Sequence, residues 1–381
     1  MFKNSITIFK ISGIPLKLHI TFLLILPFLA WIIGNNIEMI AQMTGVSVNS
    51  LNLNPYYLGL ILSILLFISV TLHELSHSFV ARSKGMKINS ITLMLLGGVA
   101  QMEEITENSR DEAWMAFSGP LFSLVFGFIL IIVANITANL IIPDVQLIIL
   151  YLGQLNIFLG IFNLLPAFPT DGGRILRALI ARKTNFLKAT KIAASIGKSF
   201  AFLFGILGVL SGNFILLFIA FFIFTGASQE YQSSLTKSTL AEFNVIDLMT
   251  RDVSTVTEDM TVQELFNKMF AERHSGYPVI NETGQVKGCV TMGDIKSIPD
   301  NKNSQKKIKD IMAAEIIKIK PEDSVQDALK KLAFKNVGRL MVMDGEKLVG
   351  IITRSDIMKG YRLKLMQKST NQMAEVNFDC R

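Results

Sequence analysis

The sequence predicts an α-helical polytopic membrane protein joined to a smaller soluble α+β part, and three observations carry that prediction. Half of the 381 residues are hydrophobic and only 18% are charged, whereas soluble domains carry about 25% charged residues. Six apolar segments approach or exceed the length that crosses a bilayer as a helix. After Tyr231 the composition becomes polar and an internal repeat begins. We therefore expect a multi-pass membrane part followed by a soluble one.

The six predicted spans lie at roughly residues 18–33, 57–81, 113–135, 147–165, 192–210 and 213–227. The last two are separated only by Ser211-Gly212-Asn213, a turn signal, and are expected to form a helical hairpin. Lys and Arg gather before the first span and within 82–111 and 170–191, whereas 34–56 and 136–146 contain none. Because basic loops remain in the cytoplasm, the protein is predicted to cross the cell membrane several times with both termini cytoplasmic.

Between the second and third spans, residues 87–102 read KINSITLMLLGGVAQM. The stretch is too short for a helical span, is rich in β-forming residues, and is interrupted by Gly97 and Gly98. It is predicted to be a re-entrant β-hairpin, which requires protein or a water-filled cavity to shield its backbone in the membrane. An ordinary cytoplasmic loop is the alternative interpretation.

The second span contains the motif HExxH, formed by His73, Glu74 and His77. Imidazoles at positions i and i+4 lie on one helix face and suit two ligands of one zinc ion. Glu74, directly after the first histidine, is placed to act as general base on a water molecule at the metal. Ionisable groups inside a span are costly and usually functional, although a polar cluster satisfied between helices is the alternative. The motif predicts a hydrolytic zinc site.

Catalytic zinc usually has three protein ligands, so one more is needed. The chain has only two cysteines, both in its C-terminal third, and no thiolate site can be built from them. At the end of the fourth span, Asn163 to Arg174 reads NLLPAFPTDGGR. Pro166 and Pro169 prevent a regular helix there, so Asp171 could turn toward a metal held by the second span. An ordinary helix terminus with an Asp-Gly turn is the other interpretation.

The soluble part contains two copies of one pattern. Asp247-Leu248-Met249 matches Asp310-Ile311-Met312 at an offset of 63, and Gly288, Thr291 and Asp294 match Gly350, Thr353 and Asp356 at 62. Each copy is expected to read strand, helix, strand, strand, helix, and the two should pack as one globular unit because neither buries its apolar face alone. The expected boundaries are a membrane domain at 1–235, repeat units at 236–303 and 304–368, and a tail at 369–381.

Taken together, HExxH in one span and the pattern N-x-x-P-x-x-P-x-D-G-G in a later one resemble the motif pair of the site-2 protease family. The similarity includes Ser118-Gly119-Pro120 and the Gly97-Gly98 hairpin, and the C-terminal repeat looks like a pair of cystathionine-β-synthase (CBS) domains. The resemblance implies about six transmembrane helices with a re-entrant β-hairpin plus a cytoplasmic α+β CBS-domain pair. It also implies an intramembrane zinc metalloendopeptidase that cleaves a transmembrane segment of a membrane-protein substrate, as in regulated intramembrane proteolysis.

The resemblance assigns roles to seven residues: zinc ligands His73, His77 and Asp171, the general base Glu74, and substrate or oxyanion contacts at Asn163, Gly97 and Gly98. One zinc ion per chain is the implied cofactor. The hairpin would pair with an unwound substrate segment by strand addition, because a helical peptide bond is shielded from hydrolysis.

CBS pairs bind adenine nucleotides in many proteins, and the resemblance places their ribose contacts at Thr291, Asp294, Thr353 and Asp356. The same residues could instead be helix N-caps in a module that forms homodimers without a ligand. A CBS-regulated transporter and an inactive membrane scaffold are the competing functions. A transporter often has an internal repeat among its spans, and a scaffold would be expected to lack Glu74 or a ligand. No basic stripe with interleaved aromatic residues suggests nucleic-acid binding.

Overall fold

The computed structural model describes residues 5–94, 97–102, 108–296 and 306–378 of the chain. The chain divides into two compact units, Met1–Gln232 and Ser233–Arg381. The first is mainly helical, and the second combines several short helices and one long one, α13 (Arg354–Phe378), with two small sheets.

Within the ranges given above, eight helices begin in the first unit: α1 (Phe22–Asn35), α2 (Ile37–Thr44), α3 (Pro55–Ser83), α4 (Ser109–Ile136), α5 (Pro143–Asn163), α6 (Asp171–Ala181), α7 (Phe186–Ser211) and α8 (Phe214–Leu240). A 3-10 turn, η1 (Val48–Ser50), lies between α2 and α3. Among the described residues, five helices are long and apolar enough to cross a membrane: α3, α4, α5, α7 and α8. The pair α1 and α2, bent by 68°, makes a sixth if it counts as one span. The predicted architecture of about six spans is confirmed.

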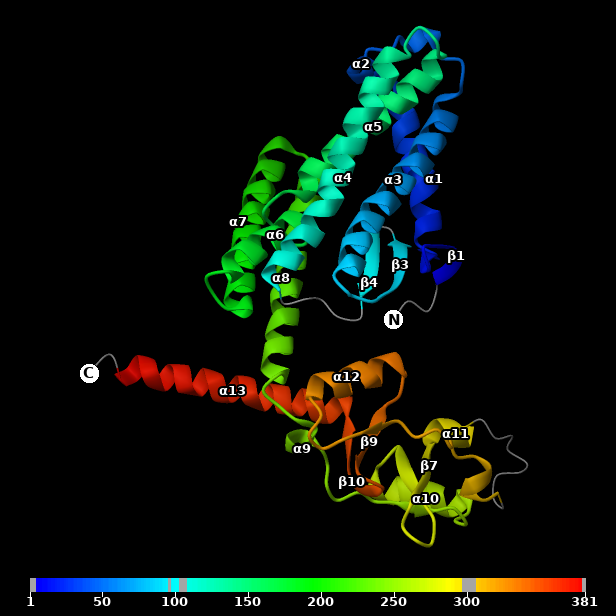
Figure 1. The fold of residues 1–381 in the computed structure, drawn as a ribbon, viewed down its shortest axis with the longest axis vertical. Coiled ribbons are helices and arrows are strands. Elements are labelled where there is room, and N and C mark those ends of the chain that lie inside the picture. Colours follow the sequence, from blue (N-terminus) through cyan, green and yellow to red (C-terminus); the bar gives the residue numbers. More distant parts are fainter. Residues whose placement is uncertain (1–4, 95–96, 103–107, 297–305, 379–381) are drawn as a thin grey trace. The chain divides into compact units, whose positions relative to one another are not determined.

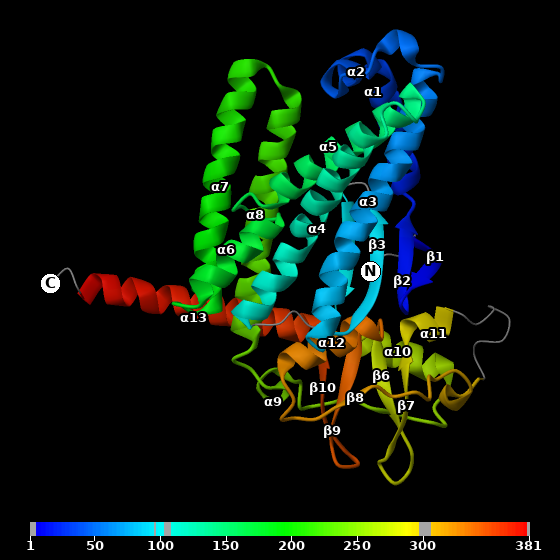
Figure 2. The same ribbon diagram turned by 45° about the horizontal axis from the view of Figure 1, so that its top comes forward.

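Helices α3, α4 and α5 lie side by side in Figures 1 and 2, and glycines allow α4 to pack closely on α5 and α3 to pack closely on α1. A Cβ added at Gly127 of α4 would lie 2.7 Å from the carbonyl oxygen of Gly153 on α5. A Cβ added at Gly59 of α3 would lie 2.3 Å from the carbonyl oxygen of Ala30 on α1. Close backbone approach through small residues is the usual way that helices associate in membranes.

A four-stranded sheet lies beside these helices, in the order β1 (Ser5–Ile11), β2 (Ile14–His19), β3 (Ile88–Met94) and β4 (Gly97–Met102). Strands β3 and β4 form the predicted hairpin, with Leu93 opposite Gly98. The sequence does not predict the N-terminal hairpin of β1 and β2, because the lysines there are typical of a basic flank of the first span. Strand β2 pairs in parallel with β3, which is distant in the chain. The pairing of Leu16 with Ile91 therefore leaves no local signal in the sequence.

The second unit repeats one pattern twice, as predicted. Its first copy contains α9 (Val245–Leu248), β5 (Val256–Thr257), α10 (Val262–Glu272), β6 (Gly276–Ile280), β7 (Val286–Thr291) and α11 (Met292–Lys296). The second contains η3 (Ile308–Asp310), β8 (Lys318–Ile319), α12 (Val325–Phe334), β9 (Arg339–Asp344), β10 (Lys347–Thr353) and α13 (Arg354–Phe378). Ile308 is buried in the core of the first copy, and Val245 is buried in the core of the second. This exchange of segments makes the two copies one packed body.

Candidate metal centre

Three side chains predicted as metal ligands converge in the first unit. His73 and His77 lie one turn apart on α3, and Asp171 is the first residue of α6. The two Nε2 atoms are 3.2 Å apart, and each is 3.2 Å from Asp171 Oδ2. Only 5%, 9% and 16% of the respective side-chain surfaces are exposed. Within the described part of the chain, this is the one group of three or more His, Cys, Asp or Glu side chains found able to hold a metal ion.

The spacing of the three donor atoms fits zinc. A tetrahedral zinc ion with bonds of about 2.0–2.1 Å holds its ligand atoms about 3.3 Å apart, close to the 3.2 Å separations observed here. Two nitrogens and one carboxylate oxygen also form the kind of three-ligand set that catalytic zinc uses.

Helix α4 orients both imidazoles through their Nδ1 atoms. His77 Nδ1 donates a hydrogen bond to the Met115 carbonyl oxygen at 2.7 Å, and His73 Nδ1 lies 2.8 Å from Ser123 Oγ. A carbonyl can only accept, so neutral His77 carries its hydrogen on Nδ1 and presents a lone pair at Nε2. With His73 in the same tautomer, two lone pairs and a carboxylate oxygen face one another, and a cation between them removes the repulsion. Such outer partners fix the orientation of metal-binding histidines.

Gly119 on α4 leaves space beside the Nε2 atoms of both imidazoles. A Cβ at this position would lie 2.3 Å from His77 Nε2 and 2.7 Å from His73 Nε2. Any side chain here would therefore occupy the space that a shared ion needs. In the sequence, Gly119 stands out only within the Ser118-Gly119-Pro120 resemblance, and neither Met115 nor Ser123 is predicted as a site residue. The only sequence signal for Ser123 is that a serine lies within an apolar span. The role of Met115 leaves no signal in the sequence, because every residue has a backbone carbonyl.

The loop before α6 is folded tightly enough to present Asp171 to the histidines. Thr170 is the residue before the helix, and its hydroxyl donates to the Leu165 carbonyl oxygen at 2.7 Å. A Cβ at Gly172 would lie 2.2 Å from that same oxygen, so the position admits only glycine without a shift of the backbone. The peptide bond between Phe168 and Pro169 is cis. The Asp-Gly-Gly sequence thus combines a proposed metal ligand, Asp171, with two glycines that allow the loop to pack closely.

The other predicted site residues of this unit make no hydrogen bond to the three proposed ligand atoms among the bonds that the structure describes. Glu74 follows His73 on α3, is partly exposed, and is close enough to interact with the charges of His77 and Asp171. Asn163 is the last residue of α5, and its Nδ2 donates to the Leu159 carbonyl oxygen at 3.0 Å. Gly97 and Gly98 begin β4, the outer strand of the sheet.

The four residues predicted to contact nucleotide form two helix caps in the second unit. Asp294 Oδ2 accepts hydrogen bonds from the backbone nitrogen and the hydroxyl of Thr291, both at 2.7 Å. Asp356 Oδ2 accepts from the same two groups of Thr353, at 3.0 Å and 2.7 Å. The bonds expected of the capping interpretation are therefore present in both copies.

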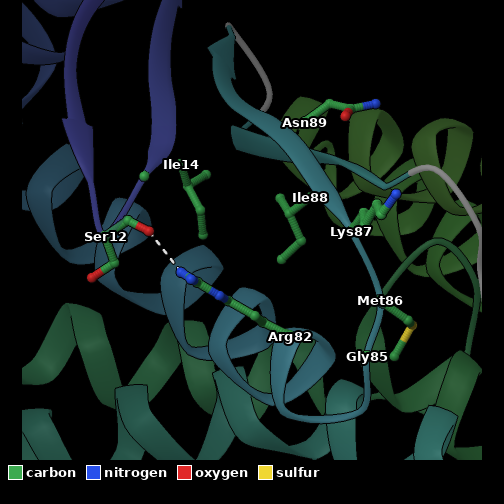
Figure 3. A pocket seen from close by; sticks show the side chains of 9 residues that line it. Ser12, Ile14, Arg82, Gly85, Met86, Lys87, Ile88 and Asn89 are labelled. Atoms are coloured by element: carbon green, nitrogen blue, oxygen red, sulfur yellow. Dashed lines mark hydrogen bonds between the residues drawn. The ribbon is translucent and has the colours of Figure 1, made fainter.

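A separate cavity of about 450 Å³ lies between the β1–β2 turn and the end of α3 (Figure 3). Arg82 reaches across it and donates through Nη1 to the Ser12 carbonyl oxygen at 2.6 Å. The residues that line it include none of the three metal-site donors. The cavity is thus distinct from the metal centre.

Comparisons with known proteins identify relatives of both units. Peptidase family M50 matches residues 61–140 and 135–204, which include the HExxH motif and Asp171, and the CBS domain matches residues 245–300 and 308–362. A zinc metalloprotease of Methanocaldococcus jannaschii is 38% identical over 359 residues, covering 93% of this chain and 95% of that protein. A CBS domain-containing protein of Bacillus subtilis is 31% identical over 116 residues, covering 30% of this chain and 82% of that protein. A solved site-2 protease structure from Methanocaldococcus jannaschii covers 60% of this chain and 95% of that chain, at 41% identity and a TM-score of 0.42.

Proposed function

The chain belongs to peptidase family M50, the site-2 protease family of zinc metalloproteases, and from that membership we propose that it hydrolyses a peptide bond within a transmembrane segment of a membrane-protein substrate. The observation that supports this most directly is the convergence of His73 Nε2, His77 Nε2 and Asp171 Oδ2 at mutual distances of 3.2 Å. We assign these three atoms as the zinc ligands.

The proposed chemistry divides between the metal and one carboxylate. Zinc, when bound, supplies Lewis-acid polarisation of the scissile carbonyl and of water. Glu74 accepts the proton of the attacking water and later delivers it to the leaving nitrogen, which is general acid–base catalysis. Met115 and Ser123 keep both histidine Nε2 atoms aimed at the ion throughout.

Substrate is proposed to bind along the free edge of β4. This strand pairs with β3 and stands last in the sheet, so its outer backbone groups are placed to bond to an added strand. Gly97 and Gly98 have no side chains that would keep an incoming backbone away. A substrate helix must unwind to pair in this way, and unwinding exposes the peptide bond that the helix shields. Asn163 is proposed to hold the substrate strand or to assist the oxyanion.

The second unit is proposed to modulate cleavage by binding adenine nucleotide at Thr291, Asp294, Thr353 and Asp356, and to support a homodimer. The proposed domain boundaries are 235/236, 303/304 and 368/369, of which 303/304 lies outside the described residues. The distribution of Lys and Arg supports cytoplasmic termini, with 34–56 and 136–146 on the outer side.

Replacing Glu74 by Gln tests the proposed reaction. The variant keeps the size and polarity of the side chain but removes the base, so zinc should remain near one per chain. Cleavage of a membrane-embedded substrate should fall by at least about 10²–10⁴-fold, the usual contribution of general acid–base catalysis. Zinc content by elemental analysis and cleavage in detergent or proteoliposomes measure the two effects separately. Near-normal cleavage by this variant would contradict the role of Glu74.

A further inference from the structure

Arg177 of α6 is the largest side chain that is almost wholly buried among the described residues, with 1% of its surface exposed. Its guanidinium pairs with Glu112 of α4, donating through Nε at 2.9 Å and also through Nη2. It also donates through Nη1 to Glu230 of α8 at 2.6 Å. The rings of Phe168 and Phe186 lie against it, with centroids 5.1 Å and 4.6 Å from Cζ. One cation thus connects four separate segments of the first unit.

This arrangement is costly if its only purpose is stability. Glu112 is wholly buried, and its Oε2 has no hydrogen-bond partner in the described structure. A buried ion pair contributes little net stability compared with apolar residues of the same size, because desolvation offsets the attraction. Its value lies rather in specifying one arrangement of the helices that carry it.

The arrangement that it specifies contains the metal centre. Glu112 lies in the first turn of α4, Met115 lies one turn further on, and Ser123 follows about two turns later. The same helix therefore holds His77 and His73 through Met115 and Ser123, and holds α6 through Glu112. Asp171, the first residue of α6, is six residues before Arg177, or about 9 Å along the helix axis.

We propose that Arg177 is a positioning residue for the metal centre: its pairing with Glu112 fixes α6 against α4 and thereby sets the distance from Asp171 to His73 and His77. The contact with Phe168 secures the loop before Asp171 in the same way. Helix α8 adds a second connection, because Glu230 binds Arg177 and a Cβ at Gly226 would lie 2.6 Å from the Pro169 ring. The inference rests on the proposed assignment of Asp171 as a ligand.

The test compares metal binding by full-length Glu112→Gln and Arg177→Lys variants with that of the wild type. Glutamine keeps the volume of Glu112 but removes its charge, and lysine cannot reproduce the planar contacts of arginine. We expect zinc affinity, measured by chelator competition, to fall about tenfold, at the low end for residues outside the ligand shell. The absorption bands of the cobalt-substituted variants should also shift, because they depend on where the ligands lie. Arg182→Lys, an exposed change at the end of α6, is the control and should match the wild type.

Asp171→Asn separates failure of this inference from failure of the proposed site. If Asp171→Asn binds zinc as tightly as the wild type, the ligand assignment itself is wrong. If it loses affinity while folded Glu112→Gln and Arg177→Lys keep wild-type affinity and cobalt spectra, the metal site stands and Arg177 serves folding alone. Should Glu112→Gln fail to fold, Arg177→Lys decides, because it retains the charge of the buried pair.

Discussion

The metal centre and the two Thr–Asp pairs of the CBS repeat are both polar groups of residues that the sequence singles out, yet their hydrogen bonds differ. In the metal centre, Nδ1 of each histidine is held by α4, while both Nε2 atoms face Asp171 Oδ2 at 3.2 Å. In the repeat, Asp294 and Asp356 accept bonds from threonines three residues away.

The difference shows which kind of polar group needs a ligand to explain it. A carboxylate that caps its own helix has a complete structural role, and capping is common at helix N-termini. The metal centre joins residues that are 98 positions apart, and the bond from His77 Nδ1 to the Met115 carbonyl oxygen leaves a lone pair at His77 Nε2, 3.2 Å from Asp171 Oδ2. Side chains that converge from separate helices, with the His Nδ1 atoms already bonded to α4, are the stronger sign of a binding site.

Loss of a proposed zinc ligand should have the largest effect, and it tests whether the metal centre binds an ion at these residues. His73→Ala should reduce zinc from about one per chain to a small fraction, since removing a ligand costs more than the roughly 10–100-fold typical of outer partners. His274→Ala is the matched control, because His274 is an exposed histidine of the second unit and should leave zinc unchanged. Elemental analysis after dialysis against a weak chelator measures both. Full zinc in His73→Ala would place the metal elsewhere.

A smaller effect on zinc binding is expected from filling the space beside the Nε2 atoms of the two imidazoles. Gly119→Ala would add a Cβ 2.3 Å from His77 Nε2, so the imidazoles or α4 must shift. We expect zinc affinity and cleavage each to fall by about tenfold or more, as for other changes around metal ligands.

Gly205→Ala is the control for Gly119→Ala. Its Cβ would meet only the Ala220 methyl at 3.9 Å, an ordinary contact. Replacing glycine by alanine inside a helix stabilises it by roughly 0.5–1 kcal/mol, so this variant should melt at or above the wild-type temperature and bind zinc normally. Equal zinc affinities in the two variants would show that the space at Gly119 is not needed.

The same comparison explains how far the sequence could predict the structure. The HExxH spacing, the span lengths and the repeat are local patterns, and the structure has the helices and strands they predict. The sequence predicts that Arg177 belongs to the basic cytoplasmic segment 170–191. The residue is buried, because Glu112 and Glu230 pair with it from helices that are distant in the chain. Met115 contributes a backbone carbonyl, which any residue could provide. Contacts between distant elements decide these roles, and spacing along the chain does not reveal them.

The smallest expected effect concerns whether the Thr–Asp pairs also bind nucleotide. In Asp294→Asn combined with Asp356→Asn, the amide oxygen can still accept from the threonine backbone, so the caps and the melting temperature should be nearly retained. A ribose hydroxyl bonded to a charged carboxylate contributes about 1.5–3 kcal/mol, so affinity for AMP, ADP or ATP should fall by about 10-fold or more. Calorimetry on the full-length protein measures this loss.

Asp327→Asn is the matched control for that variant, because Asp327 lies in the first turn of α12 and accepts from the hydroxyl of its N-cap residue, Ser324, at 2.8 Å, outside the proposed nucleotide contacts. If it weakens nucleotide binding as much as the double variant, the loss comes from altered helix caps, and Asp294 and Asp356 are not ribose contacts. If no nucleotide binds the wild type at millimolar concentration, the two pairs are caps alone. The contrast with the metal centre is then complete, because hydrogen bonds within one helix turn account for the Thr–Asp pairs, whereas the proposed zinc ligands converge from two separate helices.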